Sequence, residues 1–229
     1  MHRKLSVAGV RWSAVLIAMG LATVGCGGGG SDPAPLGKRH SSPAATPDLA
    51  APLSFSQLKE VVDLQSLPLG WKPGVQTIAG RNVPKNAPCR RPPGATCAGQ
   101  TSRAVVQYNN ADDTGNVYLE LTAYENKGAA QDGYQRRSAS SCLAKTSRRI
   151  SMSTVGNSSV ACTGSNKWTG EPFTGMEMRV GTVAALVVYT HKDKAEPHML
   201  LSLAQMEAAR IQQVQRDEKP TATLSDRDG

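Results

Sequence analysis

Two histidines, His191 and His198, are the residues of the predicted folded region that are best suited to general acid–base chemistry. The other two, His2 and His40, lie in an N-terminal stretch whose composition sets it apart. An activated serine would need His191 or His198 as its general base. However, the sequence contains no G-x-S-x-G motif, no H-E-x-x-H motif and no phosphate-binding loop. We therefore interpret both as surface or helix-cap histidines and expect no catalytic residues and no enzyme activity. A hydrolase is kept as the alternative.

The N-terminus carries a second kind of chemistry, because its pattern is that of an export signal. Arg3, Lys4 and Arg11 precede an uncharged apolar stretch over 12–25, which is too short to span a membrane as a helix. Thr23-Val24-Gly25-Cys26 then resembles the lipobox of bacterial lipoproteins, with Thr23 where Leu or Val is usual. The resemblance implies that the signal over 1–25 is cleaved, that Cys26 is lipidated and acylated with chains such as palmitate, and that the protein is anchored to the extracytoplasmic face of the cell membrane.

Residues 26–52 are predicted to form a flexible tether. The segment holds five glycines and five prolines with almost no large apolar side chain, so it cannot bury a core. A random coil of this length reaches about 30 Å. Three of the 26 basic residues and none of the 18 acidic ones lie in the signal, so its removal lowers the formal net charge from +8 to +5.

Four cysteines remain beyond the lipobox, and in an exported chain an even number predicts disulfides. Of three possible pairings we favour Cys89–Cys97, which closes a Pro-Pro-Gly loop, and Cys142–Cys162, which ties a helix to the next strands. A zinc site is the alternative, but no C-x₂₋₄-C pair is present. We expect no metal and no cofactor.

Basic residues cluster in two stretches of the sequence. The first stretch contains no acidic residue and the second contains only Asp132. Six lie over 65–111, including Arg90 and Arg91, and six over 127–149, including Arg136 and Arg137. Such clusters suit anionic lipid, an anionic cell-wall polymer or an acidic envelope protein. Nucleic acid is not expected outside the cell. The alternative, that these residues are ordinary solvated faces, carries equal weight.

Two further residues are candidates for a binding surface. Glu207 falls within the apolar stripe of the last predicted helix, where it would either mark a polar pocket or reach solvent at the edge of the stripe. A base such as Arg179, or Arg210 on the same helix, could pair with it. Trp168 lies in a loop and would serve either as a contact residue or as a lid on the core.

The elements that must position these residues follow from periodicity and capping. A capping box at Ser54 and Gln57 starts a helix, and alternation predicts two hairpins. The last helix is expected to begin around 193–197, because Asp193 and Glu196 have capping-box spacing and Pro197 suits a first helical position. We expect strands over 75–79, 103–108, 116–124, 148–154, 159–162, 176–180 and 183–189, and helices from 54, over 128–142 and from around 193–197. The strand over 183–189 is apolar on both faces, as in the middle of a sheet. Consecutive strands indicate an α+β fold, an antiparallel sheet with about three helices.

The globular part also resembles known extracytoplasmic families. The Leu67-Pro68-Leu69-Gly70-Trp71 turn, the helix ending in Cys142, the hairpin at Arg179 and the last helix around Ala209 resemble the extracellular sensor domains of PknH-type kinases. The same turn is similar to one in LpqN and PsbP-like lipoproteins. These resemblances imply a non-enzymatic domain with a surface cleft, and they supply no catalytic residues.

Together these observations predict a signal over 1–25, a tether over 26–52, a sensor-like domain over 53–216 and a frayed polar tail over 217–229. With 229 residues and 39% apolar composition, the chain is too small or too polar for a multi-span membrane protein and lacks the repeats of a coiled coil. We expect a lipid-anchored surface protein whose domain binds a ligand. A cell-envelope hydrolase, an accessory protein and a purely structural protein are the alternatives.

Overall fold

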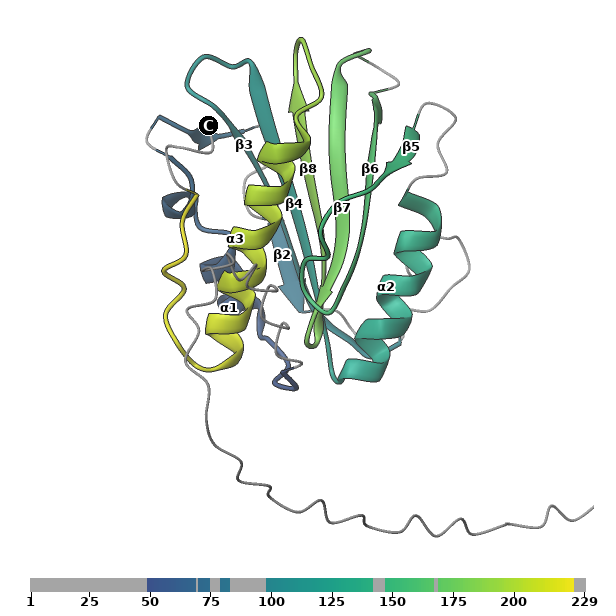
Figure 1. Ribbon diagram of the computed structural model, residues 1–229. Coiled ribbons are helices and arrows are strands. Elements are labelled where there is room, and N and C mark those ends of the chain that lie inside the picture. Colours follow the sequence, from purple (N-terminus) through teal and green to yellow (C-terminus); the bar gives the residue numbers. More distant parts are fainter. Residues whose placement is uncertain are drawn as a thin grey trace, which may run out of the picture. The chain divides into compact units, whose positions relative to one another are not determined.

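One antiparallel sheet forms the centre of the domain in the computed structural model (Figure 1). The structure describes residues 49–68, 70–74, 79–82, 98–141, 147–166 and 169–224. Within them the eight strands are β1 (Lys72–Pro73), β2 (Ala79–Asn82), β3 (Gln100–Asn109), β4 (Gly115–Tyr124), β5 (Ser147–Ile150), β6 (Ser158–Ser165), β7 (Pro172–Val180) and β8 (Val183–His191). Their order is β1-β3-β4-β8-β7-β6-β5, with β2 sharing the outer edge of β3. The predicted α+β class is confirmed.

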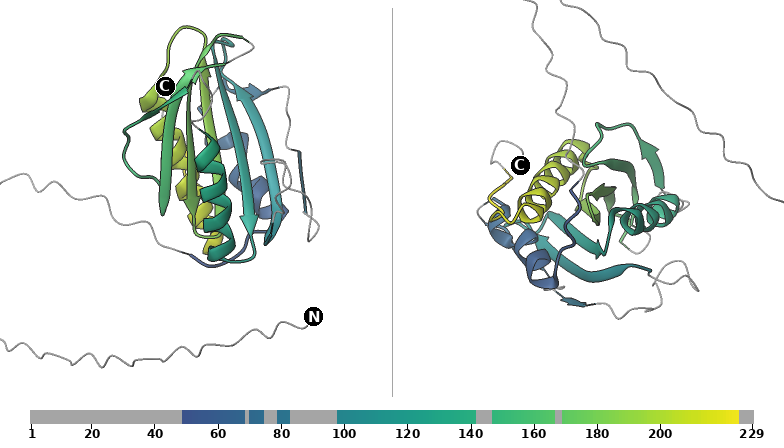
Figure 2. Two further views of the ribbon diagram at one scale, coloured as in Figure 1. Left: turned by 90° about the vertical axis from the view of Figure 1, so that its right-hand side faces the viewer. Right: turned by 90° about the horizontal axis from the view of Figure 1, so that it is seen from below.

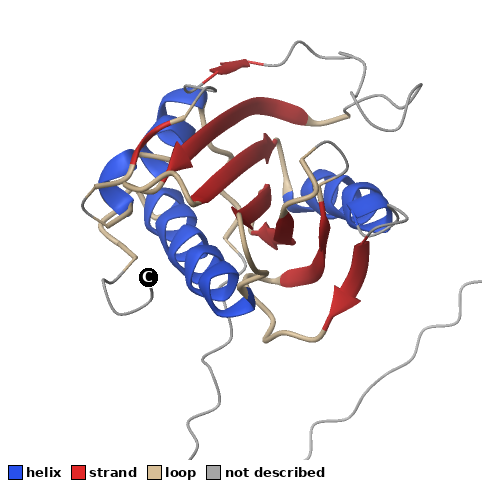
Figure 3. Cartoon of the chain, turned by 90° about the horizontal axis from the view of Figure 1, so that it is seen from above, coloured by secondary structure: helices blue, strands red, loops and turns tan. Residues whose placement is uncertain are grey.

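Two helices cover one face of this sheet. Helix α1 (Phe55–Val61) packs on β3, and α3 (Pro197–Gln215) packs on β7 and β8 and also contacts α1. Figure 3, a view from above, shows α1 and α3 on one side of the sheet and α2 on the other. The main core lies beneath α1 and α3, where alternate residues of β4 and β8, such as Leu119 and Val187, are completely buried.

Helix α2 (Lys127–Ser141) covers part of the opposite face, against β4, β7 and β8. Its position over the strands is clearest in the left panel of Figure 2. Because only a small cluster of Tyr124, Ala130, Tyr134 and Ala184 is buried here, this helix makes a much smaller apolar contact than α3 does.

The predicted capping box is confirmed. The Ser54 side chain accepts a hydrogen bond from the Gln57 backbone, and the Gln57 side chain accepts one from the Ser54 backbone. Leu53 and Leu58 on either side of the cap are both buried in the core. The start of α3 agrees less well. Pro197 is its first residue, but the N-cap is Glu196 rather than the expected Asp193, and Glu196 makes no side-chain capping bond. Its carboxylate is engaged elsewhere, as described below.

The predicted hairpins are present, and β8 lies between β4 and β7 as its apolar pattern indicated. Two expectations were wrong. The strand expected over 148–154 ends at Ile150. Part of the predicted frayed tail, over 217–224, folds back onto the domain: the Leu224 amide donates to the Ser66 carbonyl at 2.8 Å, and the Leu224 side chain is buried. The polar composition of the segment did not reveal this docking, because it depends on contacts with residues far away in the sequence, such as Ser66.

Candidate functional site

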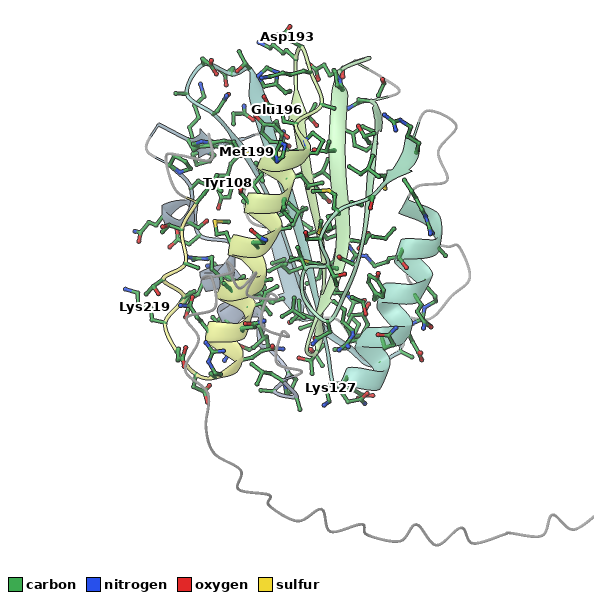
Figure 4. All side chains as sticks on the ribbon, in the orientation of Figure 1. Tyr108, Lys127, Asp193, Glu196, Met199 and Lys219 are labelled. Carbon is green, nitrogen blue, oxygen red and sulfur yellow. The ribbon has the colours of Figure 1, made fainter. Side chains whose placement is uncertain are left out.

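Two adjacent pockets lie at one end of the sheet, where β3, β4 and β8 meet the start of α3. The side chains of Asp193, Glu196 and Met199 mark this end in Figure 4, with Lys127 at the other. We call it the upper end. The first described residues lie at the opposite, lower end, because Thr182 of the β7–β8 turn donates to the Ala51 carbonyl at 2.6 Å. The nine residues of β8 separate the ends by about 26 Å.

The first hollow, which we call the aromatic pocket, has a volume of about 280 Å³ on the α3 side. It is lined by Pro68, Trp71, Asn110, Tyr189, His191, Glu196 and Met199. Gly115 has no side chain and so leaves room for the Tyr189 side chain in the pocket wall. A Cβ at this position would lie 2.7 Å from the Tyr189 hydroxyl. The pocket therefore combines two aromatic side chains with one carboxylate and one imidazole.

The surroundings of Glu196 in the aromatic pocket determine whether its carboxyl group is ionised. Partial burial raises the pKa of Glu196, but hydrogen bonds and charge from Lys194, 2.7 Å away, and from Tyr189 outweigh it and hold the pKa below its ordinary value. Burial, followed by the nearby Glu196 charge, raises the pKa of Tyr189. Glu196 is therefore ionised at neutral pH and Tyr189 is protonated.

The second hollow, which we call the polar pocket, has a volume of about 320 Å³ and opens on the α2 side. It is lined by Gln107, Asn109, Asp113, Thr114, Gly115, Asn116, Asn166, Thr169, Glu171, Thr190 and Lys192. The strand register places one row of side chains across four strands at the bottom of this pocket. Asn109 pairs with Asn116, Asn116 with Thr190 and Thr190 with Phe173. Alternation along each strand places these side chains on the same face.

Further down the same face, four charged residues form what we call the ion-pair layer: Arg103, Glu120, Arg137 and Glu177. Arg137 of α2 lies 3.2 Å from Glu177 and 3.4 Å from Glu120, and Arg103 lies 2.9 Å from Glu120. Burial raises the pKa of Glu120, but Arg137 and Arg103 more than offset it and keep that pKa below its ordinary value. The layer joins α2 to the sheet beneath the polar pocket.

These placements revise the predicted basic surface. Arg137 was expected to face a partner, yet only 17% of its side chain is exposed and it is paired within the fold. Arg103 is likewise engaged with Glu120. Arg136 is exposed, as are Arg148 and Arg149 of the same basic stretch. Arg90, Arg91 and Trp168 lie outside the described residues.

Glu207 also departs from expectation. Its side chain neither reaches solvent nor pairs with Arg179, which lies on the opposite face of the sheet. Instead it is completely buried between α3 and the rest of the core, and within the described part of the chain neither oxygen has a hydrogen-bond partner. Glu207 does not line either pocket, so we assign it a structural role.

Of the cysteines, only Cys162 falls within the described residues. It is buried on β6, opposite Gly175 of β7. Cys26, Cys89, Cys97 and Cys142 lie outside them, so neither predicted disulfide is tested. In the parts of the chain that are described, no group of His, Cys, Asp and Glu could hold a metal ion.

Sequence reasoning missed the pocket residues almost entirely. His191 was considered for catalysis and Trp71 only as part of a turn, while the amides of the polar pocket attracted no attention. The one available signal was the density of Asn, Asp and Thr over 109–116, which is equally typical of a hairpin loop. Pocket membership depends on the strand register, which a single sequence does not reveal.

Comparisons with known proteins do not assign a family. No protein-family model matches the sequence, and no curated protein matches it. The crystal structure of the extracellular domain of PknH from Mycobacterium tuberculosis aligns with a TM-score of 0.39 and 14% identity, covering 72% of this chain and 93% of that one. Similarity at this level leaves the sequence-based resemblance to PknH-type sensor domains a prediction.

Proposed function

We propose that this protein is a membrane-anchored, extracytoplasmic lipoprotein whose α+β domain binds a ligand as a sensor-like or accessory module, without catalysis. The observation that carries the proposal is the pair of pockets at the upper end of the sheet. The chain enters the domain at the lower end, beside the β7–β8 turn. A tether attached there leaves the pockets free to face away from the membrane.

The chemistry of the aromatic pocket supports binding more than hydrolysis. The imidazole of His191 accepts a hydrogen bond from the Asp193 backbone through Nδ1, at 3.2 Å. Among the described residues no serine, threonine or cysteine side chain donates to either histidine, and His198 is exposed. A nucleophile and its base need to lie within hydrogen-bond reach.

The location of the ligand site can be tested by NMR on the full-length protein in detergent. A library of small soluble fragments should shift amide signals of residues 107–116 and 189–199, which line the pockets. Signals of α2 serve as the internal control and should not move. Fragment-induced shifts confined to other regions, or none at all, would contradict a ligand site at the upper end.

The anchor is proposed from Cys26 and the lipobox resemblance. Within the described residues no helix is both long and apolar enough to cross a membrane. Two or more acyl chains on Cys26 would give a stable anchor. Labelling cells with an alkyne-bearing palmitate should tag the wild type but not Cys26→Ser, and the variant should leave the membrane fraction. Equal labelling of both would remove the proposed anchor.

Two disulfides, Cys89–Cys97 and Cys142–Cys162, form part of the same proposal. The buried position of Cys162 suits a structural bond more than a reactive thiol. Peptide mapping of the non-reduced protein should recover both cross-linked pairs. Recovery of Cys162 as a free thiol, or joined to another cysteine, would reject the pairing.

An anionic partner, whether lipid, wall polymer or envelope protein, remains proposed for the exposed basic residues Arg136, Arg148 and Arg149. These residues share the α2 and β5 region. Co-sedimentation should be stronger with anionic than with neutral vesicles and should weaken with salt. Equal sedimentation with both kinds of vesicle would argue against this surface.

A further inference from the structure

The polar pocket is lined mainly by neutral groups that can donate and accept hydrogen bonds. Seven of its side chains are amides or hydroxyls, namely Gln107, Asn109, Thr114, Asn116, Asn166, Thr169 and Thr190. An amide offers a carbonyl acceptor and two N–H donors, and a threonine hydroxyl offers both functions. A ligand hydroxyl has the same dual character, whereas a phosphate needs donors alone and an ammonium group needs acceptors alone.

Part of this capacity is not used within the fold. The Gln107 and Thr190 side chains make no hydrogen bond to any other described residue, and neither does Oδ1 of Asn116. All three are only partly buried. They come from three adjacent strands and lie in two neighbouring rows on one sheet face, so one small ligand could contact them all.

The charges at the pocket do not favour an ionic ligand. Asp113 is paired with Lys72 at 2.7 Å, and the Glu171 carboxylate accepts from Thr169 at 2.9 Å. Lys192 is the one basic side chain in the described lining, and it is exposed. A phosphate or carboxylate would thus meet a single exposed cation and two carboxylates.

The remaining lining groups hold one another in place. Asn116 donates to Oδ1 of Asn109 at 2.6 Å, and Asn109 donates to Asp113. In the loop beside them, Gly115 donates to the Asn110 side chain at 2.8 Å. Because these contacts already fix the loop, little conformational entropy would be lost when a ligand binds.

An apolar surface lies next to these polar groups. Phe173 is directly across from Thr190 in the β7–β8 register and is partly exposed on the same face. The C–H face of a sugar ring is apolar while its hydroxyls are polar, so a sugar needs this combination of an aromatic neighbour and bifunctional hydrogen-bonding groups.

We propose that the polar pocket binds a neutral sugar ring, as part of a glycan. This inference rests on the proposed function, since it names the ligand class for one of the two pockets. The volume of about 320 Å³ is near the lower limit for ligand pockets, which suits one or two rings of a longer chain rather than a large ligand.

The test uses the full-length protein in detergent on a glycan array that carries neutral, carboxylated, phosphorylated and amino sugars. Binding to neutral sugars is expected, with affinities measured afterwards by calorimetry. The variants Gln107→Met and Thr190→Val preserve side-chain size while removing polar groups. Together they should weaken neutral-sugar binding at least about tenfold.

Matched controls are Gln135→Met on α2 and Thr154→Val after β5, because both residues are exposed and neither lines a pocket. The controls should bind as the wild type does. The pocket pair and the control pair are each combined in one double variant. Thermal unfolding confirms that both double variants are folded, and a double variant that fails this test is replaced by its two single variants.

The other outcomes are distinct. Binding of phosphorylated or carboxylated sugars alone, or neutral-sugar binding that the double variant leaves unchanged, would overturn the proposal. If no sugar binds but fragments still shift the pocket signals, the proposed function stands and the sugar assignment falls. If neither sugars nor fragments perturb the upper end, both fall.

Discussion

Arg210 follows Glu207 by less than one turn of α3, yet its guanidinium does not hydrogen-bond to the Glu207 carboxylate. It donates instead to the carbonyls of Val61 and Glu60 in α1, each at 2.6 Å, and to those of Pro220 and Ala222 in the segment after α3. Glu207 is consequently buried without a hydrogen bond to any described residue. Tyr108, whose hydroxyl donates to the Val62 carbonyl, is close enough to Glu207 and Arg210 for the charges of both to act on its hydroxyl.

The first prediction concerns the pH dependence of stability. Burial raises the pKa of Glu207 to about 8, against an ordinary value of 4.5, and the charge of Arg210 only partly opposes this. The folded protein thus keeps the carboxyl protonated where the unfolded chain ionises it, so the free energy of unfolding should fall as the pH rises from about 5 to about 8. The total fall is on the order of 4 kcal/mol.

Glu207→Gln should remove this fall, because the amide does not ionise. Urea unfolding at pH 5, 7 and 9 is the measurement, and the variant should be more stable than the wild type at pH 9. Glu125→Gln, at an exposed position, is the control and should leave the wild-type profile unchanged. The other groups near this site, Asp63, Tyr108 and Arg210, remain the same in all three proteins. Identical profiles for wild type and Glu207→Gln would show that Glu207 is not the titrating group.

Arg210→Lys should detach the segment after α3. Lysine retains a positive charge but cannot reproduce the planar arrangement of donors that contacts four carbonyls in two segments. We expect a loss of about 2 to 3 kcal/mol in the free energy of unfolding. Hydrogen exchange should rise most at the Leu224 amide, which bonds to Ser66. Uniformly unchanged exchange over 217–224 would contradict the assigned role of Arg210.

The ion-pair layer predicts contrasting effects for two neighbouring arginines. Arg137→Met would leave the buried Glu177 carboxylate and the partly buried Glu120 without their shared cation, at a cost of about 3 to 5 kcal/mol. Arg136→Met, one residue earlier on the exposed side of α2, should cost at most about 1 kcal/mol, because the interactions of an exposed charged side chain contribute little. Adding Glu177→Gln to Arg137→Met should recover part of the loss. Equal costs for the two single variants, measured by urea unfolding, would show that the layer does not hold α2.

Alanine substitutions at Gly170 and Gly181 should distinguish the cost of a left-handed backbone from the cost of a steric clash, because both glycines have positive φ but only Gly181 is crowded. Gly170 has φ +76° with open space around it, so Gly170→Ala should cost about 1 kcal/mol from its left-handed conformation alone. Gly181, at the β7–β8 turn, has φ +57°, and a Cβ there would lie 2.4 Å from the Leu49 carbonyl and 2.6 Å from the Gln215 side chain. Gly181→Ala should therefore unfold at a clearly lower temperature than Gly170→Ala. The reverse order would mean that residue 49 does not pack against the turn.

Much of the fold was predictable because its determinants are local. The reciprocal bonds of Ser54 and Gln57, the proline at the start of α3 and the alternation along β4 each depend on residues only a few positions apart. The two-sided apolar pattern of β8 also revealed its central position, since this strand lies between β4 and β7 and contacts helices on both faces of the sheet. The export signal and tether were inferred in the same way, from composition alone.

The sites depended on contacts that no local pattern encodes. Arg136 and Arg137 are identical in type and adjacent in sequence, and only the packing of α2 decides that the second meets Glu177 while the first remains exposed. Glu207 is buried without a hydrogen bond to any described residue, and Arg210, its nearest basic residue on α3, donates to carbonyls of α1 instead.

By itself, then, the sequence determined the class of fold and the presence of the main helices and strands, because hydrophobic periodicity and capping act over a few residues. Only the tertiary structure decided that Asn116, Thr190 and Gln107 share a pocket, that the segment over 217–224 docks, and which arginines are exposed. The physical reason is that strand register brings together residues far apart in the chain, and buried polar groups choose partners by geometry rather than by sequence distance.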